Sequence, residues 1–481
     1  MNTLYDAVIV GSGPNGLAAA ITLARAGATV LVLEAKDTSG GGTRTQELTL
    51  PGFRHDVCSS IHPLALASPF LRTLPLSQFG LQWIHASLEL AHPFVEGSAA
   101  TVTASVVERS IAMTAQALGE DGRAYEHLMT PLVMDFEKII AAFLGPLRLP
   151  RPDNSMAMAR FALPALLPAV TMAQRTFKTP QARALFAGMA AHAIMPLEHI
   201  ATTAFGLMLA MLAHAVGWPL ARGGSQSITQ AMIGYLQTLG GKVEINHEVR
   251  SLADIPPARA ILMDITPRQL VRIAGDQLPA AYRRQLQAYR YGPGVCKVDY
   301  ALSDPIPWRS ADCARSATVH LGGSMEEIAR SERAAWTGHY DDQPYVIAVQ
   351  PSLFDSTRAP AGKHVAWAYC HVPNGSDMDM TPAIDAQVER FAPHFRDVVL
   401  ARHTFTAAQM EGHNANYIGG DINGGVQDFR QLYTRPVART VPYSTPIRNL
   451  FICSSSTPPG GGVHGMCGYY AAQAALATVL R

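Results

Sequence analysis

The first thirty-four residues show the pattern of a dinucleotide-binding unit, and they constrain the fold more strongly than any other segment. An apolar run over residues 7–10 is followed by Gly11, Gly13 and Gly16 in the spacing G-x-G-x-x-G. In such a turn the first glycine permits the tight bend, the second lets the backbone approach a pyrophosphate, and the third lets the helix pack on the strand. We therefore expect a helix over residues 15–26 whose free N–H groups face phosphate oxygens.

Glu34 completes this pattern at the end of a second apolar run, residues 29–33. A carboxylate at this position can accept both hydroxyls of an adenosine ribose, and its charge would repel a 2′-phosphate. The alternative, an ordinary strand, turn and helix in an α/β core, does not explain an acidic residue at the end of an apolar strand. The segment therefore predicts the adenosine end of a bound NAD or FAD.

Composition and charge exclude several classes of protein. A formal net charge of +1, without a basic run, argues against a nucleic-acid partner. The six cysteines form no C-x-x-C pair, so neither a disulfide framework nor a zinc site is indicated, and we expect no metal. Because the first strand begins within seven residues, we expect no signal peptide and a cytoplasmic location.

The apolar stretches are short for a membrane-spanning helix. The longest, residues 204–217, contains His214, and it is shorter than the roughly twenty apolar residues that a span requires. A second stretch, residues 161–172, is interrupted by Pro164 and Pro168. We interpret both as core or pocket-lining helices, and a peripheral contact with a membrane surface remains the alternative.

Two further glycine-rich segments accompany the first. Residues 40–44, Gly-Gly-Gly-Thr-Arg, follow Glu34 closely. Near the C-terminus an apolar strand leads into residues 460–465, and an alanine-rich helix follows. This second bend again places free N–H groups at a helix N-terminus, where they favour an electron-rich partner.

Taken together, these segments resemble the phytoene desaturase-like FAD-dependent oxidoreductases of the amine oxidase superfamily. The resemblance implies an α/β fold, in which a Rossmann-like FAD-binding domain of the glutathione reductase and amine oxidase type is interleaved with an α+β substrate domain. It implies FAD, bound without a covalent link. The implied divisions are FAD-binding segments 1–66, 218–285 and 416–481, a helical part of the substrate domain at 67–217, and its sheet at 286–415.

Between the FAD segments, the pattern over residues 64–217 is mainly helical. Alternating apolar residues predict strands of an antiparallel second sheet, which would form the wall of a substrate cavity. These strands are expected at residues 295–302, 314–323, 345–350 and 364–372.

The resemblance also implies the residues that contact the cofactor. The family usually has an arginine directly after the second loop's glycine pair, whereas this chain has Gly42, so that contact would come from Arg44 or be absent. The implied cofactor-binding residues are Gly11, Gly13, Pro14, Asn15, Gly16, Glu34, Ala35, Lys36, Gly40, Gly41, Gly42, Thr43, Arg44, Val249, Ser454, Ser455, Gly462, Val463 and His464.

Three residues are candidates for the chemistry. Lys297 lies in the middle of an apolar strand, and a lysine at the matching position of amine oxidases holds a water against flavin N5; the alternative is a strand lysine that points outward. His464 lies in the loop expected beside the flavin, and His62 could face the cavity, so each is a candidate acid or base.

Three functions remain to be weighed. The first is an FAD-dependent dehydrogenase or desaturase that passes a hydride from a small apolar substrate, isoprenoid-like or acyl-like, to flavin N5. The second is an amine-oxidase-type enzyme that uses dioxygen, for which no aromatic cage or flavin-linking cysteine is evident. The third is a lipid-binding escort protein without redox chemistry, which intact flavin segments disfavour. Sequence does not indicate the oligomeric state.

Overall fold

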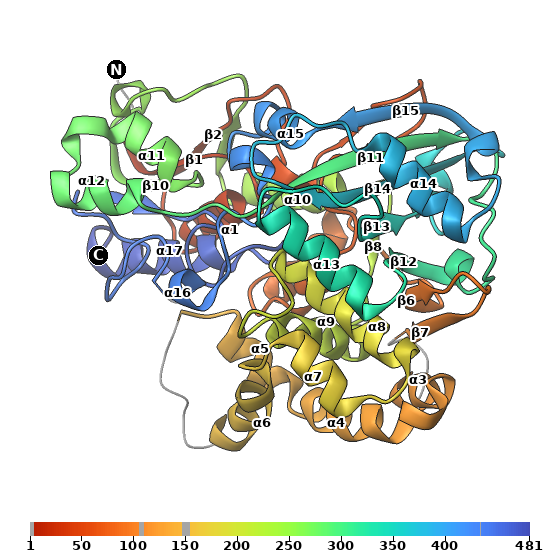
Figure 1. The fold of residues 1–481 in the computed structure, drawn as a ribbon. Helices are drawn as coiled ribbons and strands as arrows, with labels where there is room; N and C mark the ends of the chain where they lie inside the picture. Colours follow the sequence, from red (N-terminus) through yellow and green to blue (C-terminus); the bar gives the residue numbers. More distant parts are fainter. Residues whose placement is uncertain (1–3, 105–109, 147–153, 433) are drawn as a thin grey trace.

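The computed structural model describes residues 4–104, 110–146, 154–432 and 434–481. Two sheets organise the chain, and they lie side by side in Figure 1. The expected α/β class, with a Rossmann-like unit and a second sheet interleaved in the sequence, is confirmed.

The first sheet is parallel and has the strand order β16-β10-β1-β2-β9. Alternate residues of β1 belong to two different cores, because both faces of a parallel sheet are covered. Helices α1, α10 and α17 pack on one face, and α11 and α12 cover the other. The strands are β1 (Tyr5–Val10), β2 (Val30–Leu33), β9 (Lys242–Glu244), β10 (Ala258–Met263) and β16 (Leu450–Ile452), and the helices are α1 (Pro14–Arg25), α10 (Gln226–Thr238), α11 (Pro267–Ala274), α12 (Ala280–Gln287) and α17 (Met466–Thr478).

The second sheet has the order β15-β11-β14-β13-β12-β6-β7. The four strands expected from alternation are present, but the sheet is mixed rather than antiparallel, because β12 pairs with β6 in parallel. β6 and β7 lie in the segment expected to be mainly helical, and β15 was not expected. The bounds are β6 (Leu88–Pro93), β7 (Ala99–Thr103), β11 (Gly294–Leu302), β12 (Ser316–Leu321), β13 (Val346–Val349), β14 (His364–Val372) and β15 (Val399–Phe405).

Helices close the second sheet from two sides. α13 (Met325–Trp336) and α14 (Thr381–Phe391) pack near β14 and β11, while the predicted helical block lies beyond β6 and β7 (Figure 1). That block comprises α3 (Ser110–Ala117), α4 (Gly122–Met134), α5 (Phe136–Phe143), α6 (Ser155–Ala165), α7 (Ala169–Thr176), α8 (Pro180–Ala190) and α9 (Thr203–Ala215). Shorter elements connect the two halves: β3 (Thr45–Gln46), β4 (His55–Asp56), α2 (Pro63–Ala67), β5 (Trp83–Ile84), β8 (Leu220–Ala221), α15 (Ala407–His413) and α16 (Phe429–Leu432).

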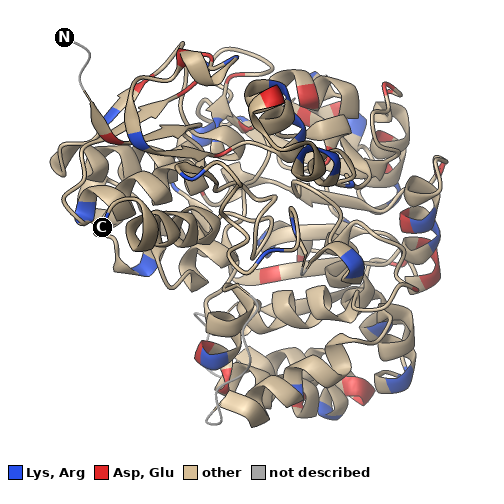
Figure 2. Ribbon diagram, turned by 90° about the vertical axis from the view of Figure 1, so that its left-hand side faces the viewer, with Lys and Arg blue, Asp and Glu red and all other residues tan. Residues whose placement is uncertain are grey.

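The two apolar stretches fold as short helices. No single helix in the described ranges is long and apolar enough to cross a membrane, and α6 and α7 meet that criterion only as a pair bent by 101°. α9, the longest apolar stretch, is mostly buried. In the view of Figure 2, acidic and basic residues are interspersed over the chain.

Candidate functional site

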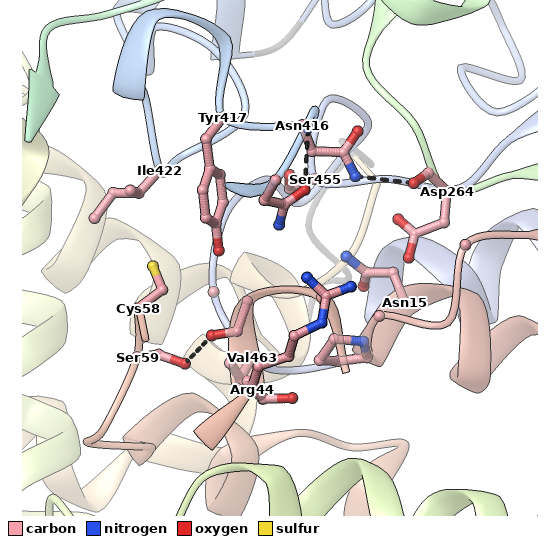
Figure 3. A pocket seen from close by; sticks show the side chains of 18 of the residues that line it. Asn15, Arg44, Cys58, Ser59, Asp264, Asn416, Tyr417, Ile422, Ser455 and Val463 are labelled. Atoms are coloured by element: carbon pink, nitrogen blue, oxygen red, sulfur yellow. Dashed lines mark hydrogen bonds between the residues drawn. The ribbon is translucent and has the colours of Figure 1, made fainter. Parts of the chain in front are cut away.

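A cavity of about 570 Å³ runs from the glycine turn after β1 to the inner face of the second sheet. Its walls come from both halves of the molecule, including the first two glycine loops, β12, β13 and β14. Figure 3 shows part of it, with Asn15, Arg44 and Tyr417 directed into the same space. The interleaved chain therefore encloses one site between its two sheets.

The glycine turn is built for close approach of backbone to a ligand. Gly11 has φ +103°, and a Cβ on Gly16 would collide with the Gly11 carbonyl oxygen. α1 begins without a side-chain cap, and Asn15 Oδ1 is buried without a partner among the described residues. An anion at this N-terminus would meet the positive end of the helix dipole, although Pro14 has no N–H and the Gly16 N–H is donated to Asp264.

Glu34 lines the cavity at the end of β2, as expected. Its Oε2 accepts hydrogen bonds from the backbone N–H and the hydroxyl of Ser12, the former at 3.0 Å. Its Oε1 accepts from the Lys36 backbone at 3.0 Å and from Arg44 Nη2 at 3.2 Å. These four contacts orient the carboxylate toward the cavity. The last of them ties Glu34 to Arg44, which was predicted to replace the arginine that is usual in the family.

Tyr417 explains why Gly42 stands where an arginine is usual. A Cβ on Gly42 would collide with the Tyr417 hydroxyl, so any side chain at this position requires the Tyr417 ring to move. The Tyr417 ring points toward Cys58 and Arg44 in Figure 3. Burial raises the pKa of the Cys58 thiol, which keeps it protonated.

Asp264, at the end of β10, fills the space beside the glycine turn. Its Oδ2 accepts a hydrogen bond from the Gly16 N–H at 2.9 Å, and its backbone oxygen accepts one from Asn416 Nδ2 at 3.0 Å (Figure 3). Burial raises the pKa of Asp264 to about 7; the Gly16 hydrogen bond opposes this rise and the Glu34 charge adds to it. A carboxyl with a pKa near neutrality therefore lies beside the glycine turn, where we expect a phosphate.

We expect the affinity for a nucleotide or flavin cofactor, with FAD as the probe, to depend on this group. A pyrophosphate at the turn would favour protonated Asp264, so affinity should fall as the pH rises through about 7. If binding raises its pKa by about one unit, the loss is roughly tenfold between pH 6 and pH 9. FAD titrations of the wild type and Asp264→Asn measure this; the variant should show little pH dependence, and equal slopes in both proteins would exclude Asp264 as the cause.

The third glycine loop meets the cavity through Gly462 and Val463. α17 starts directly after it at Met466, and its N-cap residue Gly465 has φ +69° and provides no side-chain cap. The predicted acid–base role of His464 is not supported. His464 Nε2 donates to the Gly460 carbonyl at 3.2 Å, its Nδ1 accepts from the Met466 N–H at 3.0 Å, and the ring is not part of the cavity wall. Burial lowers the pKa of His464 to about 4, so this ring braces the loop as a neutral group.

Lys297 is buried, but it does not line the cavity. Its ammonium pairs with the Asp299 carboxylate and lies 5.5 Å from the centre of the Trp367 ring, which does line the cavity. Trp367 thus contacts both the cavity and the Lys297 ammonium. Lys297 therefore does not point outward, since its side chain is buried, and it does not line the cavity in which a cofactor is expected.

His62, the third candidate, lines the cavity. Ser225 Oγ donates to the Ser59 carbonyl at 2.5 Å, so the 2.8 Å contact between Ser225 Oγ and His62 Nε2 is donated by the imidazole. The proton therefore resides on Nε2, and the buried Nδ1 keeps a free lone pair. Burial lowers the pKa of His62 to about 4. Its acid–base role stays a prediction.

Comparisons with known proteins agree with this geometry. Residues 9–73 match the NAD(P)-binding Rossmann-like domain family. The chain is 25% identical to mouse pyridine nucleotide-disulfide oxidoreductase domain-containing protein 2, over 97% of this chain and 92% of that one. It is 24% identical to phytoene dehydrogenase of Streptomyces griseus, over 95% and 92%. The protein is an oxidoreductase related to the phytoene desaturases.

Solved structures add the fold of this oxidoreductase. Wild-type putrescine oxidase bound to putrescine superposes with a TM-score of 0.62 at 19% identity, covering 99% of both chains. At that identity the likeness concerns the fold alone. The Rossmann-like family and the relatives together imply a nucleotide or flavin cofactor.

Most of the predicted cofactor-binding residues of the oxidoreductase line the cavity, and four do not. Gly16 and Gly40 allow close packing within the loops, because a Cβ on either residue would crowd neighbouring atoms. His464 braces the last loop, and Ser454 Oγ donates to the Ile265 carbonyl at 2.7 Å. The lining set contains Gly11, Gly13, Pro14, Asn15, Glu34, Ala35, Lys36, Gly41, Gly42, Thr43, Arg44, Val249, Ser455, Gly462 and Val463.

Much of the cavity's remaining wall was not among the predicted residues. Asp264 directly follows β10, so its place at a strand's carboxyl end was a usable signal. No motif marks the others. They include Cys58, Asn416, Tyr417, Asn423, His192, Leu209, Trp218, Thr318, Ile347, Val349, Trp367 and Tyr369. No group of three or more metal-ligating side chains occurs within the described part of the chain.

Proposed function

We propose that the protein is an FAD-dependent dehydrogenase or desaturase acting on a small, uncharged, apolar substrate. The observation that supports it most is the continuity of one cavity from Glu34, past Gly13 and Gly41, to Val463 and on to Trp367. A mononucleotide would leave the far half of this cavity empty. FAD, with adenosine at Glu34 and its ring system near Val463, matches its course.

The residues present fit this cofactor. The two glycine loops pack closely, since a Cβ on Gly41 would be 3.1 Å from the Gly13 Cα, and the absence of side chains lets both backbones approach a pyrophosphate together. The buried Asn15 Oδ1 lacks a partner. We infer that Glu34 exchanges its longest contact, that with Arg44, for a ribose hydroxyl. The protonated Cys58 thiol supports a non-covalent cofactor.

The chain's contribution to the chemistry is positioning and exclusion of water. Bound FAD would supply the two-electron redox step. The free N–H groups at the start of α17 lie beside the loop at Val463, where they favour negative charge. Trp367 and Tyr369, whose rings stack at 5.7 Å between centroids, wall off the opposite end with apolar surface.

The far wall favours a neutral substrate over an amine. Among described lining residues from α9, β12, β13, β14 and the turn at His192, none carries a charged side chain. An alkylammonium ion would be desolvated there without a carboxylate partner. This argues against the alternative of an amine oxidase.

Anaerobic reduction of the FAD-loaded protein tests this choice. We expect a neutral isoprenoid, with geraniol and myrcene as probes, to bleach the flavin absorption, while putrescine and benzylamine leave it unchanged. The amines serve as the comparison on the same sample, whose flavin content is measured first. Bleaching by either amine would overturn the proposed substrate class.

A further inference from the structure

The far wall of the cavity contains a polar group that no contact within the protein explains. Thr318, on β12, lines the cavity, is 2% exposed, and its Oγ1 has no hydrogen-bond partner among the described residues. A buried hydroxyl without a partner costs free energy, so native proteins rarely keep one without a reason. The surrounding wall is apolar, with Ile347 and Val349 on the next strand.

A pair of histidines lies beside this hydroxyl. His320 is two residues along β12, so it shares the sheet face of Thr318. Its Nε2 lies 3.1 Å from Nε2 of His192, which itself lines the cavity. Burial lowers the pKa of His192 to about 3 and the pKa of His320 well below its usual value, so both rings are neutral.

The contacts assign the protons of this pair. His320 Nδ1 is buried, faces Gly188, and has no partner among the described residues. An unpaired buried N–H is less tolerable than an unpaired acceptor, so the His320 proton resides on Nε2 and is donated to His192. His192, which lines the cavity, then carries its proton on Nδ1.

We propose that the substrate is an uncharged apolar molecule bearing one oxygen, as a hydroxyl or carbonyl group, that accepts a hydrogen bond from His192 Nδ1–H and also bonds Thr318 Oγ1. This rests on the proposed function and narrows its substrate class. His192 and Thr318 anchor the oxygen and so fix which carbon faces the cofactor. His320 is a positioning residue, because it acts through His192.

Calorimetric titration of the FAD-loaded protein with 1-octanol and n-octane tests the proposal, because the two probes share a chain and differ in one oxygen. Thr318→Val keeps the side-chain shape, and His192→Phe keeps a ring. We expect each variant to weaken octanol binding by several-fold to roughly tenfold while octane affinity changes little. Ile347→Val, on the same wall, is the control and should weaken both probes alike.

Each result has a definite meaning. The proposal is overturned if Thr318→Val and His192→Phe weaken octanol and octane binding equally. It is also overturned if the octanol affinity is unchanged in both variants. A wild-type protein that binds neither probe would overturn it as well. Flavin content, read from the absorption of each sample before titration, tests the proposed function separately. A protein that does not load with FAD contradicts the proposed function, whereas equal losses for both probes in loaded protein contradict this inference alone.

Discussion

Gly13→Ala should lose flavin without losing its fold. The new Cβ would lie 3.0 Å from Asp264 Oδ2, a contact that a small shift relieves, but it would also enter the space that we assign to the pyrophosphate. We expect FAD affinity to fall by roughly a hundredfold, about 2.7 kcal/mol, with little change in melting temperature. Flavin absorption after gel filtration and a thermal melt of the same sample measure both.

Two further substitutions make this result specific. Gly16→Ala should fail more severely, because its Cβ collides with the Gly11 carbonyl oxygen, and we expect it to lose stability as well as flavin. Gly412→Ala is the matched control, since no atom lies within 4 Å of its added Cβ. If Gly13→Ala retains wild-type flavin content, the pyrophosphate does not lie at this turn.

Lys297→Met should destabilise the protein strongly. The substitution removes the cationic partner of Asp299, whose side chain is fully buried, and an unpaired buried charge typically costs about 3–5 kcal/mol. Burial already raises the pKa of Asp299 to about 6 even with Lys297 present, so part of this cost is avoided if the carboxyl takes up a proton. Chemical denaturation at neutral pH measures the free energy of unfolding.

The double variant Lys297→Met/Asp299→Leu separates structure from chemistry. Replacing both partners by apolar side chains should recover most of the lost stability. Because Lys297 does not line the cavity, we also expect wild-type rates of flavin reoxidation by dioxygen in this variant. A stable double variant with strongly slowed reoxidation would show that Lys297 acts on the cofactor after all.

The adenosine end of the site could be predicted because its determinants are local. Gly11, Gly16 and Glu34 lie within one βαβ unit, and the backbone geometry that each requires follows from residue type and spacing. The same reasoning found the glycines of the last loop. It did not distinguish residues that face the cavity from residues such as Gly16 that hold the loop.

The candidate catalytic residues were harder to predict because their roles depend on non-local contacts. Asp299 is two residues from Lys297 and therefore on the same face of β11, so the ion pair was readable from the sequence. The Trp367 ring that contacts Lys297 comes from β14, seventy residues later. The loop around His464 supplies hydrogen-bond partners to both of its ring nitrogens, which residue type and position alone do not indicate.

The substrate end could not be predicted for a related reason. His192 and His320 meet although 128 residues separate them, and no motif marks either. Their meeting depends on two features of the fold. β6 and β7 extend the second sheet, although they come from a segment whose pattern is mainly helical, and Gly188 leaves space for the His320 ring. Such packing follows from the tertiary fold rather than from local pattern.

The flavin spectrum of the purified protein tests the central claim most directly. After incubation with FAD and removal of the free cofactor, we predict roughly one flavin per chain, with a visible absorption band at about 450 nm that is released intact by denaturation. This result would agree with one cavity that binds the whole cofactor from Glu34 to Val463. A colourless protein that retains no flavin after this treatment would contradict the account.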